Sequence, residues 1–231
     1  MGTKKKRINL TDDGFNSQLV ENALFSGLLE FPIIRRPDQL IIPNSMIPFS
    51  KRKYTNKFSE ALMFYEYDFH FQKFIDNVEE LKSDIMNFPI IITPDCSVYR
   101  DMPLVLQMTN TYLNRQIGYY LQKQGCYVIP NVRRGDERSY IRIIPNEIPF
   151  AFLGIEKNSI VSIGTYGCCK TIDDKYYLKE GLRAMIKELE PDVVLVYGAM
   201  PPAIFKEFED LTKFINYPDW TSVKHGRLWN G

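Results

Sequence analysis

One stretch of this sequence decides the fold, and it reads Ile90-Ile91-Ile92-Thr93-Pro94-Asp95-Cys96-Ser97-Val98-Tyr99-Arg100-Asp101-Met102-Pro103. Its apolar beginning is typical of a strand that is covered on both faces, as the strands of parallel sheets are. The apolar run then stops abruptly in charged and hydroxyl side chains. Because parallel sheets present their chemistry at the carboxyl ends of the strands, we expect these polar groups to form the rim of a site.

Similar apolar runs recur along the chain and alternate with helical patterns. The runs cover residues 30–34, 61–67, 88–93, 127–132, 159–164 and 193–197, and helices are predicted over residues 71–86, 103–124 and 174–190. This alternation is typical of right-handed βαβ crossovers, so we predict an α/β fold with a mostly parallel sheet of about six strands. Both an irregular or partial (β/α) barrel and an open doubly wound sheet fit the pattern.

The longest predicted helix has clear signals at both ends. Asp101 is its expected cap, Pro103 suits its first turn, and Gly125 can end it. We therefore expect this helix to start beside the polar rim.

The length of the chain suits one large domain with its own core, since it has 231 residues and a mass of 27.0 kDa. We predict a flexible N-terminal tail over residues 1–14 and a single α/β domain over residues 15–231. Residues 35–56 contain three prolines and a basic run, and we predict that they form a long irregular connection.

The composition excludes several classes of protein. A net charge of +1 gives no global field that would attract nucleic acid, so any such affinity has to come from a local patch. No apolar stretch approaches the length of a membrane span, and no apolar signal core follows the basic first residues. We therefore expect a cytoplasmic protein that does not bind membranes.

The cysteines and histidines argue against a zinc site. The four cysteines, Cys96, Cys126, Cys168 and Cys169, show no CxxC spacing, and the chain has two histidines. A carboxylate site for a divalent metal ion, Mg²⁺ or Mn²⁺, stays open as a cofactor site. Its expected ligands are Asp95, Glu66 and Asp68.

Three carboxylates are candidate catalytic groups. Asp95 is the strongest, because a carboxylate that follows a buried strand and a proline is held rigidly and is partly desolvated. It can act as a general base or a metal ligand, or it can be a turn residue that bonds nearby backbone amides. Asp101 would support it, and Glu66 is the second candidate catalytic carboxylate.

Basic and aromatic side chains are expected at the same edge of the sheet. The candidate ligand-binding residues are Tyr99, Arg100, Asn114, Arg115, Arg133, Arg138, Tyr166 and Tyr197. Arginines bind phosphate through bidentate contacts, and tyrosines at strand ends can stack on a base or a sugar. The alternatives are a self-neutralising surface loop for residues 133–138, simple packing for the tyrosines, and a solvent-facing position for Asn114 and Arg115.

Several motifs together resemble one family of unknown function. These motifs are residues 94–103, Asn114-Arg115 with Gly118 and Tyr119, Gly125 with Val128-Ile129-Pro130, residues 136–140, and residues 194–198. In this order, over residues 31–198, they resemble the domain-of-unknown-function family four-four-one-seven (DUF4417), which occurs in bacteria, phages and other mobile elements. The resemblance implies the cytosol of a bacterium or a phage-infected host, and it implies no activity.

The chain departs from that family at two places. Cys96 stands where family members carry an aromatic residue after Pro-Asp, and Arg134 and Gly135 stand where many carry an aromatic residue. These departures would change the lining of a pocket but leave Asp95, Arg100 and Asp101 in place.

No reaction signature accompanies these residues, because the sequence lacks a Walker lysine loop, a GxGxxG turn, a GxSxG elbow and an HExxH motif. The leading hypothesis is a phage or mobile-element protein that binds or processes a phosphate-bearing ligand, either nucleic acid or nucleotide, at the strand ends. Arg100, Arg133 and Arg138 would contact the anion. One alternative is a non-catalytic protein that binds a partner protein or sequesters a small molecule. Another is a carbohydrate-active barrel with Glu66 and Asp95 as its carboxylate pair.

Overall fold

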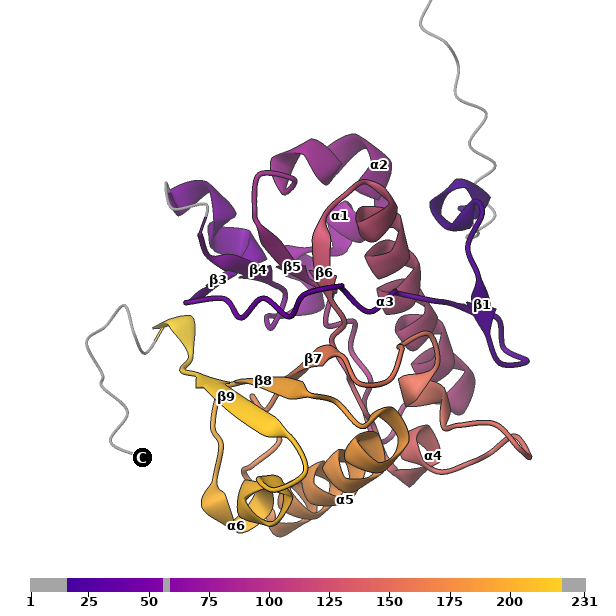
Figure 1. Ribbon diagram of the computed structural model, residues 1–231, viewed down its shortest axis with the longest axis vertical. Coiled ribbons are helices and arrows are strands. Elements are labelled where there is room, and N and C mark those ends of the chain that lie inside the picture. The colour runs from indigo at the N-terminus through magenta and orange to yellow at the C-terminus, as the bar shows by residue number, and fades with distance from the viewer. Residues whose placement is uncertain (1–15, 56–58, 222–231) are drawn as a thin grey trace, which may run out of the picture.

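Seven parallel strands form the centre of the protein (Figure 1). The computed structural model describes residues 16–55 and 59–221. One sheet has the order β3-β4-β5-β6 and the other the order β7-β8-β9. Their bounds are β3 Met46–Pro48, β4 Ala61–Met63, β5 Ile90–Ile92, β6 Tyr127–Ile129, β7 Ile160–Gly164, β8 Val193–Tyr197 and β9 Lys213–Tyr217.

The two sheets are joined just beyond the end of β6. A parallel bridge links Asn131 to Ser162, with Val132 N donating to Ser162 O at 2.8 Å and Ser162 N donating to Pro130 O at 2.9 Å. The strands therefore follow one another in chain order from β3 to β9, without the reversal that an open doubly wound sheet has.

The joined sheets curve around one apolar core. Its buried members come from all seven strands or the residues directly after them, and they are Met46, Ala61, Met63, Tyr65, Ile90, Ile92, Ile129, Ile160, Val193, Leu195, Tyr197 and Tyr217. Between the two outer strands, Tyr217 Oη donates to Pro43 O at 2.6 Å. Among the described residues no ladder pairs β9 with β3, so the array is curved but does not close into a barrel.

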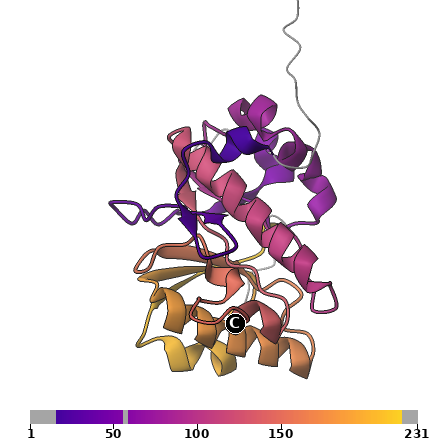
Figure 2. The same ribbon diagram turned by 90° about the vertical axis from the view of Figure 1, so that its right-hand side faces the viewer.

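Helices cover the outer faces of both sheets, and each layer has its own core. Figure 2 shows the helices of the first half of the chain above and those of the second half below. Their bounds are α1 Gln72–Asp76, α2 Val78–Leu81, α3 Leu104–Lys123, α4 Glu137–Tyr140, α5 Ile172–Leu189 and α6 Pro202–Phe205. Short 3-10 helices span Ser17–Val20, Phe49–Tyr54, Asp68–His70, Lys82–Asp84, Phe150–Phe152 and Lys206–Phe208. No helix in residues 16–55 and 59–221 is long and apolar enough to span a bilayer.

The predicted α/β class with parallel strands is confirmed, and five of the six predicted runs contain a parallel strand. The run at residues 30–34 is the exception. There β2 (Phe31–Pro32) pairs antiparallel with β1 (Phe25–Ser26) in a separate two-stranded sheet. Two parallel strands were not predicted: β3 lies inside the supposed irregular connection, and β9 lies near the end of the described chain.

The helix predictions need two corrections. The helix expected over residues 71–86 is broken into α1, α2 and a 3-10 turn. Helix α3 starts at Leu104 with Pro103 as its N-cap residue, so Asp101 lies outside the helix and does not cap it. A capping box does start α5, where Thr171 and Asp174 bond each other's backbone N–H groups. The predicted flexible tail at residues 1–14 lies outside the described residues.

Candidate functional site

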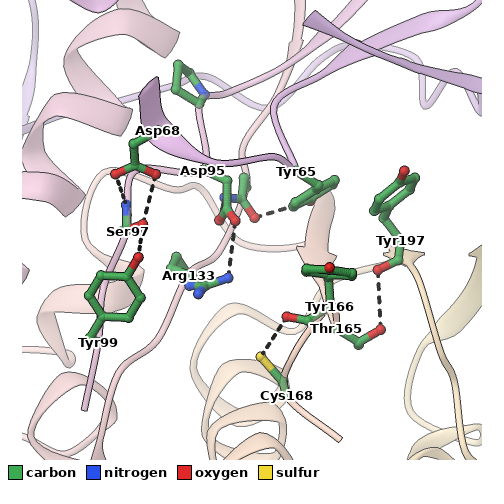
Figure 3. A network of polar contacts seen from close by, with 12 residues as sticks. Tyr65, Asp68, Asp95, Ser97, Tyr99, Arg133, Thr165, Tyr166, Cys168 and Tyr197 are labelled. Atoms are coloured by element: carbon green, nitrogen blue, oxygen red, sulfur yellow. Dashed lines mark hydrogen bonds and ion pairs between the residues drawn. The ribbon is translucent and has the colours of Figure 1, made fainter. Parts of the chain in front are cut away.

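A buried carboxylate lies where the two sheets meet. Asp95 follows β5 and is 9% exposed. Its Oδ1 accepts a hydrogen bond of 2.6 Å from Asn131 Nδ2, and its Oδ2 accepts one of 3.1 Å from Arg133 Nη1. Because Asn131 and Arg133 follow β6, the carboxyl ends of two neighbouring strands hold this carboxylate on both oxygens, as Figure 3 shows for Asp95 and Arg133.

Tyr65 extends this network to the second sheet. Its hydroxyl lies 3.1 Å from Asn131 Oδ1, to which it donates, and 2.5 Å from Ser162 Oγ. Its ring stacks on Tyr197, with centroids 5.1 Å apart and planes 12° apart. Gly164 makes room for it, because a Cβ there would lie 2.6 Å from the Tyr65 ring. The network therefore ties β4, β6, β7 and β8 together at their carboxyl ends.

Helix α3 positions the turn that carries Asp95. Asn114 Nδ2 donates to Pro94 O at 2.6 Å, and Thr93 Oγ1 donates to Asn114 Oδ1 at 3.0 Å. Thr93 Oγ1 in turn accepts from Asn131 N at 2.7 Å. Gly118 lets the helix come this close, because a Cβ there would clash with the side chain of Thr93. The two residues just before Asp95 are thus fixed by buried hydrogen bonds.

Arg115 is buried behind the site and binds backbone carbonyls. Its Nε donates to Leu153 O at 2.9 Å, its Nη2 to Ala151 O at 2.7 Å and its Nη1 to Asn131 O at 3.1 Å. Nη1 also donates to Asn114 Oδ1. Within the described part of the chain, Arg115 forms no ion pair with a carboxylate, so its positive charge stays uncompensated beneath Asn131.

Burial changes the proton affinities of these groups. It raises the pKa of Asp95, although Arg133 and Asn131 partly oppose this shift. Asp95 raises the pKa of Arg133, whereas burial lowers the pKa of Arg115 to about 9 and that of Arg134 to about 10. Three largely buried guanidinium groups therefore lie close to the strand ends, and one of them is paired with Asp95.

We expect the raised pKa of Asp95 to make the stability difference between the Asp95→Asn variant and the wild type grow with pH. The native state keeps the Asp95 proton to a higher pH than the unfolded chain, so the contribution of Asp95 to the free energy of unfolding falls as pH rises from 3.8 through the raised pKa. The Asp95→Asn variant lacks this group. Its free energy of unfolding minus that of the wild type should therefore increase over this range, as measured by urea unfolding at a series of pH values.

The Asp136→Asn variant provides a control of opposite sign. Burial raises the pKa of Asp136, but hydrogen bonds from Arg138 lower it more, so the net shift is downward. The free energy of unfolding of Asp136→Asn minus that of the wild type should therefore decrease as pH rises. A flat or falling difference for Asp95→Asn would contradict the assignment of a desolvated carboxylate at this position.

The structure brings together some of the predicted site residues. Asp95 and Arg133 form an ion pair, and Tyr197 joins them through Tyr65. Tyr99 and Asp68 meet at Ser97, whose hydroxyl donates to Asp68 Oδ1 at 2.8 Å and lies 3.0 Å from Tyr99 Oη. Tyr166 lies on the rim after β7 and is 63% exposed. These residues therefore lie at the carboxyl ends of the parallel strands.

Other predicted site residues have different contacts. Arg100 pairs with Asp174 at 2.7 Å, and Arg138 pairs with Asp136 at 2.5 Å. Glu66 Oε1 accepts from Ser50 N at 2.8 Å, while Asp101 is exposed on the surface. Asn114 and Arg115 are buried, so neither faces the solvent or an open groove. These six residues do not contact Asp95.

The predicted metal ligands do not assemble. Among residues 16–55 and 59–221, no group of three or more His, Cys, Asp or Glu side chains is placed to hold a metal ion. Asp68 accepts its two hydrogen bonds from Ser97 and Glu66 accepts one from Ser50. Asp95 is held by Asn131 and Arg133 instead.

Sequence reasoning did not assign Thr93, Ser162 or Gly164 to the site. Thr93 and Ser162 are polar residues at the end of, or inside, an otherwise apolar run, and both are fully buried. Such a residue must find a hydrogen-bond partner inside the protein, which is a usable signal. Gly164 carries no signal, because the need for a glycine depends on where the Tyr65 ring lies.

The site is open on its outer side. The cleft between α3 and the loop after β5, which Arg133 and Asn114 help to line, has no room for a water molecule. Arg133, however, has 24% of its side chain exposed. We call the surface at the carboxyl ends of the parallel strands, where Arg133 is exposed, the mouth of the curved array. A ligand would therefore meet Arg133 at this mouth and not in the cleft behind it.

Comparisons with known proteins find one family and phage relatives. The model of a family described as "Domain of unknown function (DUF4417)" matches residues 23–218. The Gene 1 protein of Mycobacterium phage L5 is 27% identical over 197 residues, which cover 84% of this chain and 82% of that protein. The Gene 1 protein of Mycobacterium phage D29 is 28% identical over 149 residues, or 64% of this chain and 52% of that protein. No solved structure matches the chain.

Proposed function

This chain belongs to the DUF4417 family, and we propose that it binds a phosphate-bearing ligand, a nucleotide or a nucleic acid, at the carboxyl ends of its parallel strands. The sequence motifs over residues 31–198 resemble this same family, so the family match confirms that resemblance. Since that family has no known activity, the proposal rests on the site. We further propose that the protein works in the cytosol of a bacterium or a phage-infected host, which its similarity to phage proteins supports.

The observation that carries the proposal is the unused hydrogen-bonding capacity of Arg133. One nitrogen, Nη1, bonds Asp95, and within the described residues the buried Nε has no partner. A guanidinium presents its N–H donors as a planar fork that matches two oxygens of a phosphate. Asp95 fixes the direction of the guanidinium, while 24% of the Arg133 side chain stays exposed and within reach of a ligand.

Excess positive charge supports the same conclusion. Arg115 lies behind Asn131 with backbone carbonyls as its partners, and Arg134 contacts the sulfur of Met185 at 3.6 Å. Two carboxylates stand against these two arginines and Arg133: Asp95, which pairs with Arg133, and Asp68, whose charge also acts on Arg133. In a partly desolvated site, such an imbalance favours an anionic ligand.

Asp95 also gives the site a group that can exchange a proton. Its raised pKa brings protonation closer to neutral pH, which suits a general acid or base. A phosphate-bearing ligand on Arg133 would lie beside it. If the protein catalyses a reaction, we propose that Asp95 moves the proton and Arg133 holds the anion.

The Arg133→Ala variant tests this function. We expect it to bind phosphate-bearing probes about 10- to 100-fold more weakly than the wild type, the loss typical of a charge-assisted hydrogen bond. The probes are inorganic phosphate, mononucleotides and short oligonucleotides, and binding is measured as the rise in melting temperature that each causes.

Two further variants make the test specific. Arg142→Ala removes an arginine that pairs with Glu188 away from the mouth, at 2.8 Å, and should bind the probes like the wild type. Arg133→Lys keeps the charge but loses the planar fork, so its affinity should be intermediate. The proposal fails if no probe stabilises the wild type, or if Arg133→Ala is stabilised as much as Arg142→Ala.

A further inference from the structure

Exposed aromatic side chains gather at the carboxyl end of the strand array. Among the described residues, the strongly exposed aromatics are Phe25, Tyr54, Tyr67, Phe69, Tyr99, Tyr166 and Tyr176. Five of the seven, Tyr67, Phe69, Tyr99, Tyr166 and Tyr176, lie in segments that follow β4, β5 or β7, at the end that holds Asp95 and Arg133. Rings exposed for packing reasons alone would be spread over the surface, whereas these five share one end of the fold.

Hydrogen bonds connect the rings that follow β4 to the ring that follows β5. Tyr67 and Phe69 stack with centroids 5.8 Å apart and planes 11° apart. Between them in the chain, Asp68 accepts hydrogen bonds from the amide and the hydroxyl of Ser97, at 3.1 and 2.8 Å. The same hydroxyl reaches Tyr99 Oη at 3.0 Å. The three rings are therefore held on one edge, although each is more than half exposed.

Arg100 continues this edge to the start of α5. Its Nη2 pairs with Asp174 at 2.7 Å, and its guanidinium lies 5.0 Å from the centre of the Tyr177 ring. The neighbouring ring, Tyr176, is 59% exposed. We call Tyr67, Phe69, Tyr99 and Tyr176 the aromatic arc.

Arg133 lies beside this arc. Asp95 contributes most to raising the pKa of Arg133, and Tyr99 and Asp68 also raise it. Figure 3 shows Tyr99 on one side of Arg133 and Tyr166 on the other. In this view two exposed rings lie on either side of the cation that we propose to bind phosphate.

We propose that the aromatic arc binds single-stranded nucleic acid, with bases stacked on its rings and a backbone phosphate on Arg133. This proposal rests on the function proposed above and names its ligand. Stacking on successive aromatic rings beside a basic group is how proteins bind single strands without reading sequence. In a duplex the base faces are already stacked on one another, so the arc should discriminate against double-stranded ligands.

The test compares ligands of different length and form by fluorescence anisotropy. A labelled oligothymidylate of about 12 nucleotides should bind the full-length protein more tightly than a labelled dinucleotide or the duplex of the same length. Phe69→Ala and Tyr99→Ala should each weaken binding of the oligothymidylate roughly tenfold, the effect typical of one lost base stack.

Two matched variants separate stacking from other effects. Phe25→Ala removes an exposed ring outside the arc and should leave binding unchanged. Tyr99→Phe keeps the ring but loses the contact with Ser97, so it should retain most of the affinity.

Three results would overturn the proposal. The first is that phosphate or mononucleotides bind but the affinity for oligonucleotides does not increase with strand length. The phosphate site on Arg133 would then stand, and the aromatic arc would not take part in binding. The second is that Phe69→Ala and Tyr99→Ala bind like Phe25→Ala. The third is that the arc variants lose binding to a neutral oligosaccharide while no oligonucleotide binds, which would mark the rings as a sugar platform.

Discussion

Replacing Arg115 with methionine is expected to lower the free energy of unfolding by about 3 to 5 kcal/mol. The guanidinium is 1% exposed and donates to the backbone carbonyls of Leu153, Ala151 and Asn131. Methionine fills much of the same volume but leaves these three acceptors without their donor. Each buried acceptor without a donor costs about 1 to 3 kcal/mol, and the relief from burying a charge offsets part of the sum.

The same substitution should weaken the proposed site. Arg115 bonds the carbonyl of Asn131, and the side chain of Asn131 bonds Asp95. When the carbonyl loses its donor, the amide that holds Asp95 is less well fixed. At a temperature where the Arg115→Met protein is still folded, it should therefore bind the ligand more weakly than the wild type.

Urea unfolding of three variants checks this prediction. Arg115→Lys keeps a positive charge but can reach fewer carbonyls, so its free energy of unfolding should lie between those of the wild type and Arg115→Met. Arg142→Met, on the surface, should lose less than about 1 kcal/mol because an exposed ion pair contributes little. Equal stability of Arg115→Met and Arg142→Met would show that Arg115 does not hold these carbonyls.

The strands that sequence predicts well are those buried on both faces. β5, β7 and β8 are continuous Ile- and Val-rich runs, and no other element type fits so short an apolar segment. β3 and β9 are the outer strands of the array, and β3 is buried and apolar but only three residues long. β3 ends in Pro48, which an edge strand tolerates, and β9 exposes Lys213. Their pairing depends on partners far along the chain, so local pattern could not reveal it.

For the site, the strand-end rule placed Asp95 and Arg133 at one edge, where the structure pairs them, whereas the helix-face interpretation put Arg115 in a groove and the structure buries it. Helix α3 buries a polar face that includes Gln107, Thr111, Asn114 and Arg115. Hydrophobic periodicity identifies the buried face of a helix only when that face is apolar, so it could not place these side chains inside. Arg115 is a predicted ligand-binding residue because polar residues repeated on one side of a helix can line a groove, whereas here it binds the protein's own carbonyls.

Replacing Gly154 with alanine is the second change expected to have a large effect, a loss of about 2 to 4 kcal/mol in the free energy of unfolding. Gly154 has φ +74°, and a Cβ there would lie 2.5 Å from Pro32 O and 3.2 Å from Arg115 Cγ. Gly154 O also accepts a hydrogen bond from Ile34 N at 2.9 Å. The added methyl group would push this backbone contact apart, because a carbonyl oxygen cannot rotate away as a side chain can.

Gly125 gives a control that separates the two causes of strain in Gly154→Ala. Its φ is +89°, but a Cβ there would meet nothing within 4 Å, so Gly125→Ala should cost about 1 kcal/mol for conformation alone. The difference between the two losses, measured by urea unfolding, reports the clash with Pro32 and Arg115. If the clash involves Arg115, the combined Gly154→Ala and Arg115→Ala variant should lose less stability than the sum of the single losses, because alanine lacks the Cγ and Cδ atoms that the new Cβ would meet. Additive losses would assign the whole clash to Pro32.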